Sequence, residues 1–540
     1  MDIIFGFEPK VASSNLAGGT KIMTIPKEVK NIIVSLQKAG FEAYIAGGCV
    51  RDFLLAGPKP TGEGGLDKEP QDWDITTNAK PEEIQKVFPD SFYENNFLTV
   101  TVRVGSPDGE AVEDPRCPRQ QSGHRDKKQG LSEIEITTYR QEAKYSDKRH
   151  PDQVKYAKTL QEDLSRRDFT INAMALRMGL GQAKKEVIDL FGGQKDFKKK
   201  LIRAVGNPQE RFNEDALRML RAVRFAATIE FNIEKETAEA IKKNSIWLEA
   251  ISQERIRDEF VKIIMSDKAE EGIELLRELN LLKYIIPELL DNYGVSQNKH
   301  HIYDCYQHAI KSLGYAAKKK FNMHVRLAAL LHDIAKPKVK SGEGEEATFY
   351  NHEIVGAKIT FQILNRLKFS RKDVEKITKL VRFHLFYYNV GEVGESSVRR
   401  LLKNVGPENI EELLQVRQAD RIGSGVPKAE PYKLRHLKYL IDKVSQDPIS
   451  AKMLEINGND LMNILKIKPG PKIGQILDIL LGYVLDDPKN NKKEFLHKES
   501  EKLGKLSDKE LQKMAEKSKQ EKQEVETKKD EMTKQKYWVT

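Results

Sequence analysis

Cysteine is scarce in this chain of 540 residues, which contains only Cys49, Cys117 and Cys305. Three cysteines at these spacings form neither a disulfide framework nor a CxxC zinc pattern, so we expect a reducing compartment, the cytoplasm. Long apolar runs are also missing, because no stretch approaches the roughly 20 consecutive apolar residues of a membrane span. Residues 1–22 lack the basic and apolar regions of a secretory signal, and we interpret them as a disordered leader or an extension upstream of Met23. The sequence therefore predicts no membrane partner.

The chain is rich in charge: 91 Lys and Arg residues oppose 81 Asp and Glu residues, which gives a formal net charge of +10. Charged residues make up 32% of the sequence and hydrophobic residues 39%, as is typical of a globular protein. A chain of this length is too long for one core and predicts about two to four domains. The positive excess suits RNA or DNA as a partner, although many lysine-rich chains are only well solvated.

Alternation of apolar and polar residues predicts strands only near the start of the chain. A short strand ends at a glycine turn near residue 47, and further strands are predicted at 73–77, 95–104 and 132–140. Polar segments at 57–70, 105–130 and 141–155 predict loops. From about residue 165 to residue 485 the apolar residues recur at helical spacing. We therefore predict an α+β protein, in which a small head with a mixed sheet and helices precedes a long all-helical remainder.

Two carboxylates stand where the strand at 73–77 begins. Asp72 and Asp74 are two residues apart, so on a strand their side chains share one face. Two hard oxygen ligands on one face can hold Mg²⁺, which in turn binds triphosphate oxygens. The alternative is a pair of solvated loop acids, and the neighbouring motifs favour the metal.

The first of these motifs is GGCVRD, in a strand–turn–helix context. Gly47 and Gly48 let the backbone approach phosphates closely, and the start of the next helix offers free N–H groups to an anion. Arg51 and Asp52 lie one turn into that helix, where Arg51 can reach a phosphate. Farther along, RRDFTIN holds Arg167, Asp168 and Asn172. These residues are either a helix cap with surface arginines or ligands of phosphate and ribose.

A template for the edge of a nucleotide base is the sharper interpretation of EDALRMLRAVRF at 214–225. Asp215 can accept a hydrogen bond from the exocyclic amino group of cytosine or adenine, while Arg218 donates to the adjacent ring nitrogen. Uracil and guanine present the reverse pattern, so one site can select C and A. Arg221 and Arg224 continue the arginine series and are predicted to bind nucleotide as well. The competing interpretation is a solvated helix face of salt bridges one turn apart.

Seven motifs in this order resemble the class II tRNA nucleotidyltransferase and bacterial poly(A) polymerase superfamily: GGCVRD, DWDITT, EITTYR, RRDFTINAMA, DLFGG, EDALRMLRAVRF and ERIRDEF. The resemblance covers residues 28–290 and, with later segments, extends almost to residue 498. It implies a polymerase-β-like head followed by a helical neck and body. It also implies Mg²⁺-dependent transfer of CMP and AMP from CTP and ATP to the 3′ end of tRNA.

The resemblance assigns roles to individual residues by motif. Asp72 and Asp74 would hold the metal, with Glu135 as a third carboxylate. Gly47, Gly48, Arg51 and Asp52 would lie at the triphosphate. Arg167, Asp168 and Asn172 would lie near phosphate and sugar, and Asp215 and Arg218 would form the base template. One position departs from the pattern, because Leu98 stands in NNFLTVTV where similar sequences have glycine.

A second set of metal-binding side chains lies in the helical part: His308, His332, Asp333, His352, His384 and Asp420. Such residues on several helices can converge on a divalent metal inside a bundle, whereas a single histidine is more simply a helix-face residue. The segment resembles the HD phosphohydrolase domain, and the residues that match its metal ligands are His308, His332, Asp333 and Asp420. His352 and His384 would support a second metal. Such domains hydrolyse phosphomonoesters, phosphodiesters or cyclic phosphates.

We accordingly divide the chain into six segments. The first three are a leader at 1–22, a nucleotidyltransferase head at 23–160, and a helical neck and body with the base template at 161–290. The others are an HD-like domain at 291–430, a tRNA-contacting helical region at 431–498 and a charged tail at 499–540. Related functions share these motifs, namely poly(A) polymerase and the partial enzymes that add only CC or only A. A different class of function is an HD phosphohydrolase with a non-catalytic RNA-binding head. A third is an RNA-binding protein without activity.

Overall fold

The computed structural model of the chain describes residues 25–55, 73–94, 98–104, 133–143, 153–179, 185–297, 302–386, 388–445 and 451–539. The chain forms two compact units, Met1–Val381 and Arg382–Thr540, and each is described by itself. Within these described ranges, no helix has the length and apolar character that crossing a membrane requires.

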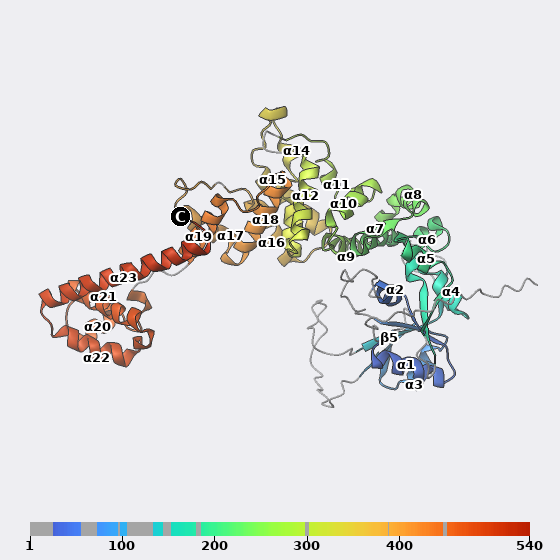
Figure 1. Ribbon diagram of the computed structural model, residues 1–540, viewed down its shortest axis with the longest axis horizontal. Coiled ribbons are helices and arrows are strands. Elements are labelled where there is room, and N and C mark those ends of the chain that lie inside the picture. The colour runs from blue at the N-terminus through green and yellow to red at the C-terminus, as the bar shows by residue number, and fades with distance from the viewer. Residues whose placement is uncertain are drawn as a thin grey trace, which may run out of the picture. The chain divides into compact units, whose positions relative to one another are not determined.

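A mixed sheet of seven strands, in the order β3-β4-β5-β2-β1-β8-β9, forms the head of the first unit (Figure 1). The strands in that order are Ser91–Glu94, Thr99–Arg103, Glu133–Thr138, Asp74–Thr77, Ala43–Ala46, Met174–Met178 and Lys185–Asp189. β2 and β5 pair in parallel, and the other neighbours pair antiparallel. The α+β prediction, with a mixed sheet preceding helices, is confirmed.

Two strand pairs lie where the sequence pattern predicts other structure. β8 and β9 belong to the sheet although the apolar spacing after residue 165 predicts helices, and this prediction was wrong for them. β8 pairs on both sides, with β1 and β9, and its first three residues are all buried. A strand covered on both faces has no apolar–polar alternation to detect. The predicted loop at 141–155 contains the hairpin of β6 (Arg140–Ala143) and β7 (Gln153–Tyr156).

The sheet separates two apolar cores, and β1 contributes to both. Ala43 and Ile45 belong to the core that also holds α1 (Lys27–Lys38) and α3 (Pro81–Val87), which lie together beside the sheet in Figure 1. Tyr44 and Ala46 alternate with them and face the second core, where Leu164 at the end of α4 (Leu160–Ser165) packs. Tyr44 is the register partner of Thr76, and side chains two apart on a strand share a face, so the face that carries Tyr44 also carries Thr76 and Asp74.

Helices make up most of the rest of the first unit. Their bounds are α2 Gly48–Leu55, α5 Gly193–Lys198, α6 Pro208–Glu214, α7 Leu217–Ile229, α8 Lys235–Asn244, α9 Gln253–Ile264, α10 Ala269–Glu278, α11 Pro287–Leu290, α12 Cys305–Lys318, α13 Met323–Leu331, α14 Lys336–Val339, α15 His352–Arg366 and α16 Arg371–Phe383. A short parallel pair, β10 (Leu201–Ile202) with β11 (Asn232–Ile233), lies beside α7. The boundary between the two units lies in the last turn of α16.

The second unit is helical in its described part. Its helices are α17 Glu395–Val405, α18 Ile410–Gly423, α19 Tyr432–Ser445, α20 Gly458–Leu465, α21 Pro471–Asp486, α22 Lys493–Gly504 and α23 Asp508–Lys536. The predicted charged tail, 499–540, therefore contains a long helix (Figure 1). Leu511 and Ala515 on α23 are buried in the same core as Leu503 of α22. The tail completes a hydrophobic core because Leu511, Met514 and Ala515 lie on one face of α23.

Leu98, which stands where a glycine is expected from similar sequences, has a backbone conformation that favours glycine. Its φ angle is +54°, in the left-handed region that costs a residue with a Cβ about 1–2 kcal/mol. Its carbonyl accepts a hydrogen bond from the backbone N–H of Thr138, which ties the start of β4 to the end of β5. The chain thus keeps the turn geometry for which similar sequences use glycine.

Candidate active sites

A glycine turn between β1 and α2 brings an acid and an arginine together. Gly47 has a φ angle of +93°, and a Cβ built on it would collide with the guanidinium of Arg167. The same Cβ would lie 3.6 Å from Oδ2 of Asp74. Only glycine fits this position, and α2 begins directly after it, with its first N–H groups at the turn.

Asp74 has a second carboxylate beside it in the sheet. Glu135 of β5 is its register partner across the parallel β2–β5 pair. Register partners point to the same face of a sheet, so the two side chains stand side by side on the face that carries the glycine turn. Paired carboxylate oxygens are the hard ligands that Mg²⁺ requires, and these residues fit the predicted metal. Asp72 lies outside the described residues, so its place in the pair stays a prediction.

Arg51 and Asp168 are linked through an amide. Arg51 donates to Oδ1 of Asn172 at 2.8 Å, and the amide nitrogen of Asn172 donates to Oδ1 of Asp168 at 3.0 Å. Oδ2 of Asp168 accepts from the guanidinium of Arg221 on α7. Burial alone would raise the pKa of Asp168, but Arg221 and the hydrogen bond from Asn172 hold it well below its usual range. Arg51 also pairs with Asp52 at 2.7 Å.

Asp215 and Arg218, the predicted base template, are each held by another charged side chain. Oδ1 of Asp215 accepts from the backbone N–H of Leu217 at 3.0 Å, and Oδ2 accepts from Arg255 of α9 at 3.1 Å. The guanidinium of Arg218 donates to Glu214 at 2.8 Å. A carboxylate has about four lone-pair sites, so Asp215 can still accept a hydrogen bond from a base.

The arginine series on α7 is not a solvated face. Arg218 pairs with Glu214, Arg221 with Asp168 and Arg224 with Glu259, and all three side chains are at most 35% exposed. Arg221 reaches the loop before β8 and Arg224 reaches α9, so these pairs join separate elements. The solvated-face interpretation is therefore wrong, and the nucleotide-binding role of the series stays a prediction.

Three supporting residues of this site were not singled out from the sequence. Asp163 is fully buried and receives hydrogen bonds from Thr76 and Arg166, with Arg167 3.8 Å away. Arg255 orients Asp215, and Glu259 of the same helix meets Arg224. The ERIRDEF motif contains Arg255 and Glu259 four residues apart, and that motif was the available signal.

Side chains from three helical segments converge in the second predicted site. Nε2 of His308 on α12 lies 2.9 Å from Nε2 of His332 and 3.1 Å from Oδ2 of Asp333. Nε2 of His352 on α15 lies 3.3 Å from the other oxygen of Asp333. All four residues are buried. The structure brings these predicted ligands together, as a shared divalent cation requires.

The imidazoles are oriented for metal binding by backbone carbonyls. Nδ1 of His332 donates to the carbonyl of Ala329 at 2.8 Å, and Nδ1 of His352 donates to that of Phe349 at 2.7 Å. A carbonyl oxygen only accepts, so in the neutral rings the lone pair is on Nε2, which faces Asp333. This donor set fits a divalent metal well.

Lys336 also belongs to this cluster and was not singled out from the sequence. Its buried ammonium lies 2.7 Å from Oδ2 of Asp333 and donates to Gln297 at 2.6 Å. Burial alone would raise the pKa of Asp333, but His332 and Lys336 hold it well below its usual range. The spacing HDxxK, one helical turn, was the available signal. His384 and Asp420 are buried too, but they belong to the second unit, and their role at this site stays a prediction.

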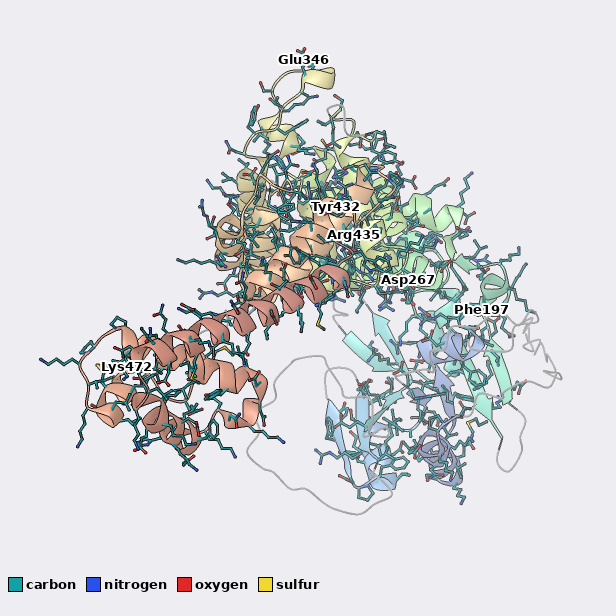
Figure 2. The ribbon with its side chains drawn as sticks, turned by 60° about the vertical axis from the view of Figure 1, so that its left-hand side comes forward. Phe197, Asp267, Glu346, Tyr432, Arg435 and Lys472 are labelled. Atoms are coloured by element: carbon teal, nitrogen blue, oxygen red, sulfur yellow. The ribbon has the colours of Figure 1, made fainter. Side chains whose placement is uncertain are left out.

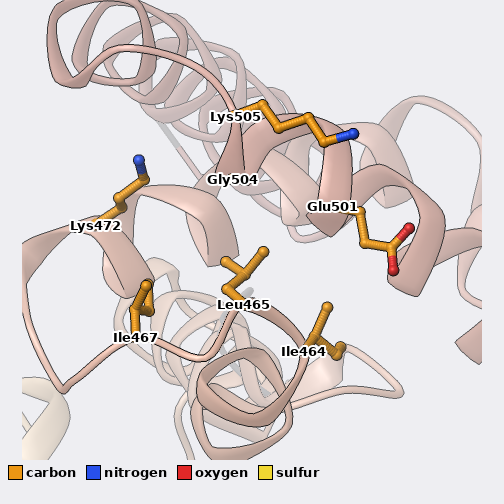
Figure 3. Close-up of a pocket in the computed structure, with 7 residues that line it drawn as sticks. All are labelled: Ile464, Leu465, Ile467, Lys472, Glu501, Gly504 and Lys505. Atoms are coloured by element: carbon orange, nitrogen blue, oxygen red, sulfur yellow. The ribbon is translucent and has the colours of Figure 1, made fainter.

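Basic, aromatic and apolar side chains gather in the segment predicted to contact tRNA, 431–498. On α19, Cζ of Arg435 lies 5.9 Å from the ring centre of Tyr432 (Figure 2). Farther along, an open pocket of about 390 Å³ has Ile464, Leu465 and Ile467 at its floor and Lys472 and Lys505 at its rim (Figure 3). Lysines beside apolar surface, such as the half-buried Lys472 and the exposed Lys505, suit a nucleic-acid backbone.

Three segments of the chain match known families. Residues 43–203 match the poly A polymerase head domain, residues 230–292 the family described as the probable RNA and SrmB-binding site of polymerase A, and residues 347–499 the family described as tRNA nucleotidyltransferase domain 2, putative. Between the last two matches lies the segment that carries His308, His332 and Asp333.

The chain is also similar to named proteins over most of its length. The CCA-adding enzyme of Ligilactobacillus salivarius is 34% identical over 497 residues, which is 89% of this chain and 98% of that protein. The CCA-adding enzyme of Lactobacillus helveticus is 42% identical over 251 residues, or 46% of this chain and 53% of that protein. The crystal structure of the Bacillus stearothermophilus CCA-adding enzyme in complex with CTP matches with a TM-score of 0.50 and 25% identity, and covers 88% of this chain and 96% of that one.

Proposed function

The chain belongs to the CCA-adding enzyme family of tRNA nucleotidyltransferases, and we propose that it adds CMP and AMP, taken from CTP and ATP, to the 3′ end of tRNA. The observation that supports this most is the 34% identity to the Ligilactobacillus salivarius enzyme over 98% of that protein. The local geometry agrees, because the Gly47 turn holds Asp74 and Arg167 where a magnesium triphosphate would lie.

The chemistry needs no protein nucleophile. Asp74, with Asp72 and Glu135, would hold magnesium, and two such ions supply an acidified 3′-hydroxyl and charge compensation for pyrophosphate. The backbone at Gly47 and the guanidinium of Arg167 would grip the triphosphate and keep its α-phosphorus in line with the RNA 3′ oxygen. The new P–O bond forms as the bond to pyrophosphate breaks.

Base choice would come from Asp215 and Arg218. Asp215 accepts from the exocyclic amino group of C or A, and Arg218 donates to the adjacent ring nitrogen. Arg255 and Glu214 already hold these two side chains, so little reorganisation is needed when the base arrives. Asp215→Ala is expected to let UTP and GTP in, which single-nucleotide incorporation measures.

The decisive experiment incubates a tRNA that lacks its 3′ CCA with Mg²⁺ and each labelled nucleoside triphosphate in turn. We expect CMP and AMP transfer, and we expect Asp74→Asn to lower it by about 10³-fold or more, because the variant keeps the shape but loses the metal ligand. Asp90→Asn, at an exposed carboxylate of the same head, is the matched control. Retained transfer in a folded Asp74→Asn protein would refute the assignment.

Poly(A) polymerase and enzymes that add only CC or only A share the motifs of this site. Sequencing the products separates them, since a CCA-adding enzyme stops after three nucleotides whereas a poly(A) polymerase continues with AMP. An inactive RNA-binding head would instead bind tRNA with no Mg²⁺ requirement and no turnover. The intact acid pair of Asp74 and Glu135 favours the enzyme.

The buried histidine cluster favours a second activity, an HD-type metal phosphohydrolase. His308, His332 and Asp333 would hold one divalent metal, and His352 would support a second, with His384 and Asp420 as the remaining predicted ligands. A metal there supplies an activated water for attack on phosphorus. Lys336, beside Asp333, would bind a phosphate oxygen of the substrate.

The test is hydrolysis of 2′,3′-cyclic phosphates and of phosphomonoesters with Mg²⁺, Mn²⁺, Ni²⁺ or Co²⁺. We expect metal-dependent turnover that Asp333→Asn abolishes. His324→Gln removes a histidine that pairs with Asp373 outside the cluster, so it should leave turnover intact. Absence of hydrolysis with every metal would make the domain a scaffold without activity.

A further inference from the structure

Phe225, near the end of the EDALRMLRAVRF motif, has three guanidinium groups around one ring. The Cζ atoms of Arg224, Arg51 and Arg221 lie 4.2, 4.8 and 5.5 Å from the ring centre. The side chain is only 5% exposed, and the ring of Phe169 meets it edge-on at 5.9 Å. A buried phenylalanine that gathers three arginines has more than a space-filling role.

These three cations come from two parts of the fold. Arg51 lies on α2, directly after the glycine turn of the sheet, whereas Arg221 and Arg224 lie on α7, the helix that follows Asp215. Arg51 is assigned to the triphosphate, and α7 carries the base template residue Arg218. The ring of Phe225 therefore touches both the phosphate side and the base side of the proposed nucleotide site.

Each arginine also has a carboxylate, and the three guanidinium groups repel one another. Asp52, Asp168 and Glu259 are those partners. The pKa of Arg224 is lowered, first by burial and then by the charge of Arg221, and also by that of Arg51. An aromatic face attracts cations through its quadrupole without occupying their N–H donors. The ring can thus hold like charges close together while their N–H donors bind other partners.

We propose that Phe225 is a positioning residue that couples Arg51 at the triphosphate to the template helix α7, so that phosphate binding and base selection depend on one ring. This inference rests on the proposed nucleotidyl transfer. Without the ring, the mutual repulsion of the three arginines separates α2 from α7. The affinity for the nucleoside triphosphate and the choice of its base should then fall together.

The experiment compares Phe225→Leu with Phe260→Leu. Phe260 on α9 is fully buried, and α9 packs against α7, so both changes remove a buried ring at similar cost in stability. We expect Phe225→Leu to raise KM for CTP and ATP about tenfold, to change kcat less, and to raise misincorporation of UMP. Phe260→Leu should keep both KM values within about twofold.

A conservative variant and a binding measurement complete the test. Phe225→Trp keeps an aromatic face and should restore much of the lost affinity, and Phe225→Met replaces Phe225→Leu if the latter does not fold. Equal effects of Phe225→Leu and Phe260→Leu, or a Phe225→Trp protein as weak as Phe225→Leu, would overturn the proposal. Calorimetric binding of CTP without tRNA separates the role of Phe225 from the proposed nucleotidyl transfer. A wild-type protein that binds CTP but transfers no nucleotide would contradict only the proposed transfer.

Discussion

Asp215 and Arg218, the proposed base template, are each held by a neighbouring charged side chain. Arg255 approaches Asp215 from α9, and Glu214 approaches Arg218 from the preceding residues of the chain. An aspartate with one oxygen on a backbone N–H and the other on an arginine has little rotational freedom. We therefore expect discrimination between bases to depend on Arg255 and Glu214 as well as on Asp215 and Arg218.

Replacing Arg255 tests this dependence. Arg255→Gln removes the ion pair to Asp215, so the carboxylate can rotate and accept from other donors. We expect the preference for CTP over UTP to fall about tenfold, while transfer of CMP continues. Competition between the two labelled nucleotides measures the ratio.

The control lies two residues farther along the same helix. Arg257→Gln removes an arginine that pairs with Asp258 instead of Asp215. Its nucleotide preference should match that of the wild type. An Arg255→Gln protein with an unchanged preference for CTP over UTP would show that Asp215 does not need Arg255 to hold its orientation.

At the scale of elements, short helices attach the motifs to the sheet through buried charge. Asp163 on α4 is inaccessible to solvent and binds Thr76 of β2 and Arg166. Burial alone would raise the pKa of Asp163, but Arg166 and Arg167 lower it below 3.8. The ionised carboxylate thus joins the RRDFTIN segment to the strand that begins with Asp74.

A pH prediction follows from the direction of this shift. A carboxyl whose pKa is lowered in the folded state stabilises the protein at pH values above its ordinary pKa of 3.8. This stabilisation is lost as the pH falls below 3.8 toward the pKa of the folded state. Asp163→Asn should therefore lower the free energy of unfolding by about 3–5 kcal/mol at pH 7, because the half-buried Arg166 and Arg167 lose their charged partner. It should also make the acid limb of the stability curve shallower. Denaturant unfolding between pH 3 and pH 7 measures both effects, and Asp90→Asn is the exposed control. If stability falls equally steeply with acid in Asp163→Asn and in the wild type, the prediction is contradicted.

The last long helix, α23, illustrates how few apolar residues a charged segment needs. Leu511 is fully buried in the core of the second unit, whereas Val525 on the same helix is 39% exposed. Leu511→Ala should cost about 2–4 kcal/mol of unfolding free energy, since it leaves a cavity. Val525→Ala should stay within about 0.5 kcal/mol. Thermal unfolding of the full chain compares the two, and equal melting temperatures would mean that the tail contributes no core.

At the scale of the whole molecule, the two sets of chemical groups occupy separate parts of the first unit. The acids and arginines of the nucleotide site lie between residues 47 and 259, and the buried histidines follow from residue 308. Each site has its own proposed carboxylate ligand for a metal, Asp74 in one and Asp333 in the other. The proposed segment boundaries separate the same two sets.

Metal removal and substitution should therefore affect the two sites independently. Asp333→Asn should remove a tightly held Mn²⁺ or Ni²⁺ that survives dialysis of the wild type, and it should leave CMP transfer within about twofold. Asp74→Asn should abolish CMP transfer and leave the tightly held metal in place. Elemental analysis of dialysed proteins, together with the transfer assay, measures both. Loss of CMP transfer in Asp333→Asn would show that the sites depend on each other.

The sequence by itself determined the motifs, their order and most of the head's elements. Alternation found β4 and β5, and the glycine pair found the turn before α2, because these signals are local in the chain. It did not find β8, which is buried on both faces and so shows no alternation.

Only the tertiary structure decided which charged residues meet. The pairs of Asp215 with Arg255 and of His308 with Asp333 join residues 40 and 25 positions apart, and no period in the sequence encodes such a distance. The clustering of Arg51 with α7 around Phe225 depends likewise on how a helix of the head packs against a helix beyond it. The residue type determines which interactions a side chain can make. The packing of distant segments determines which partner it meets.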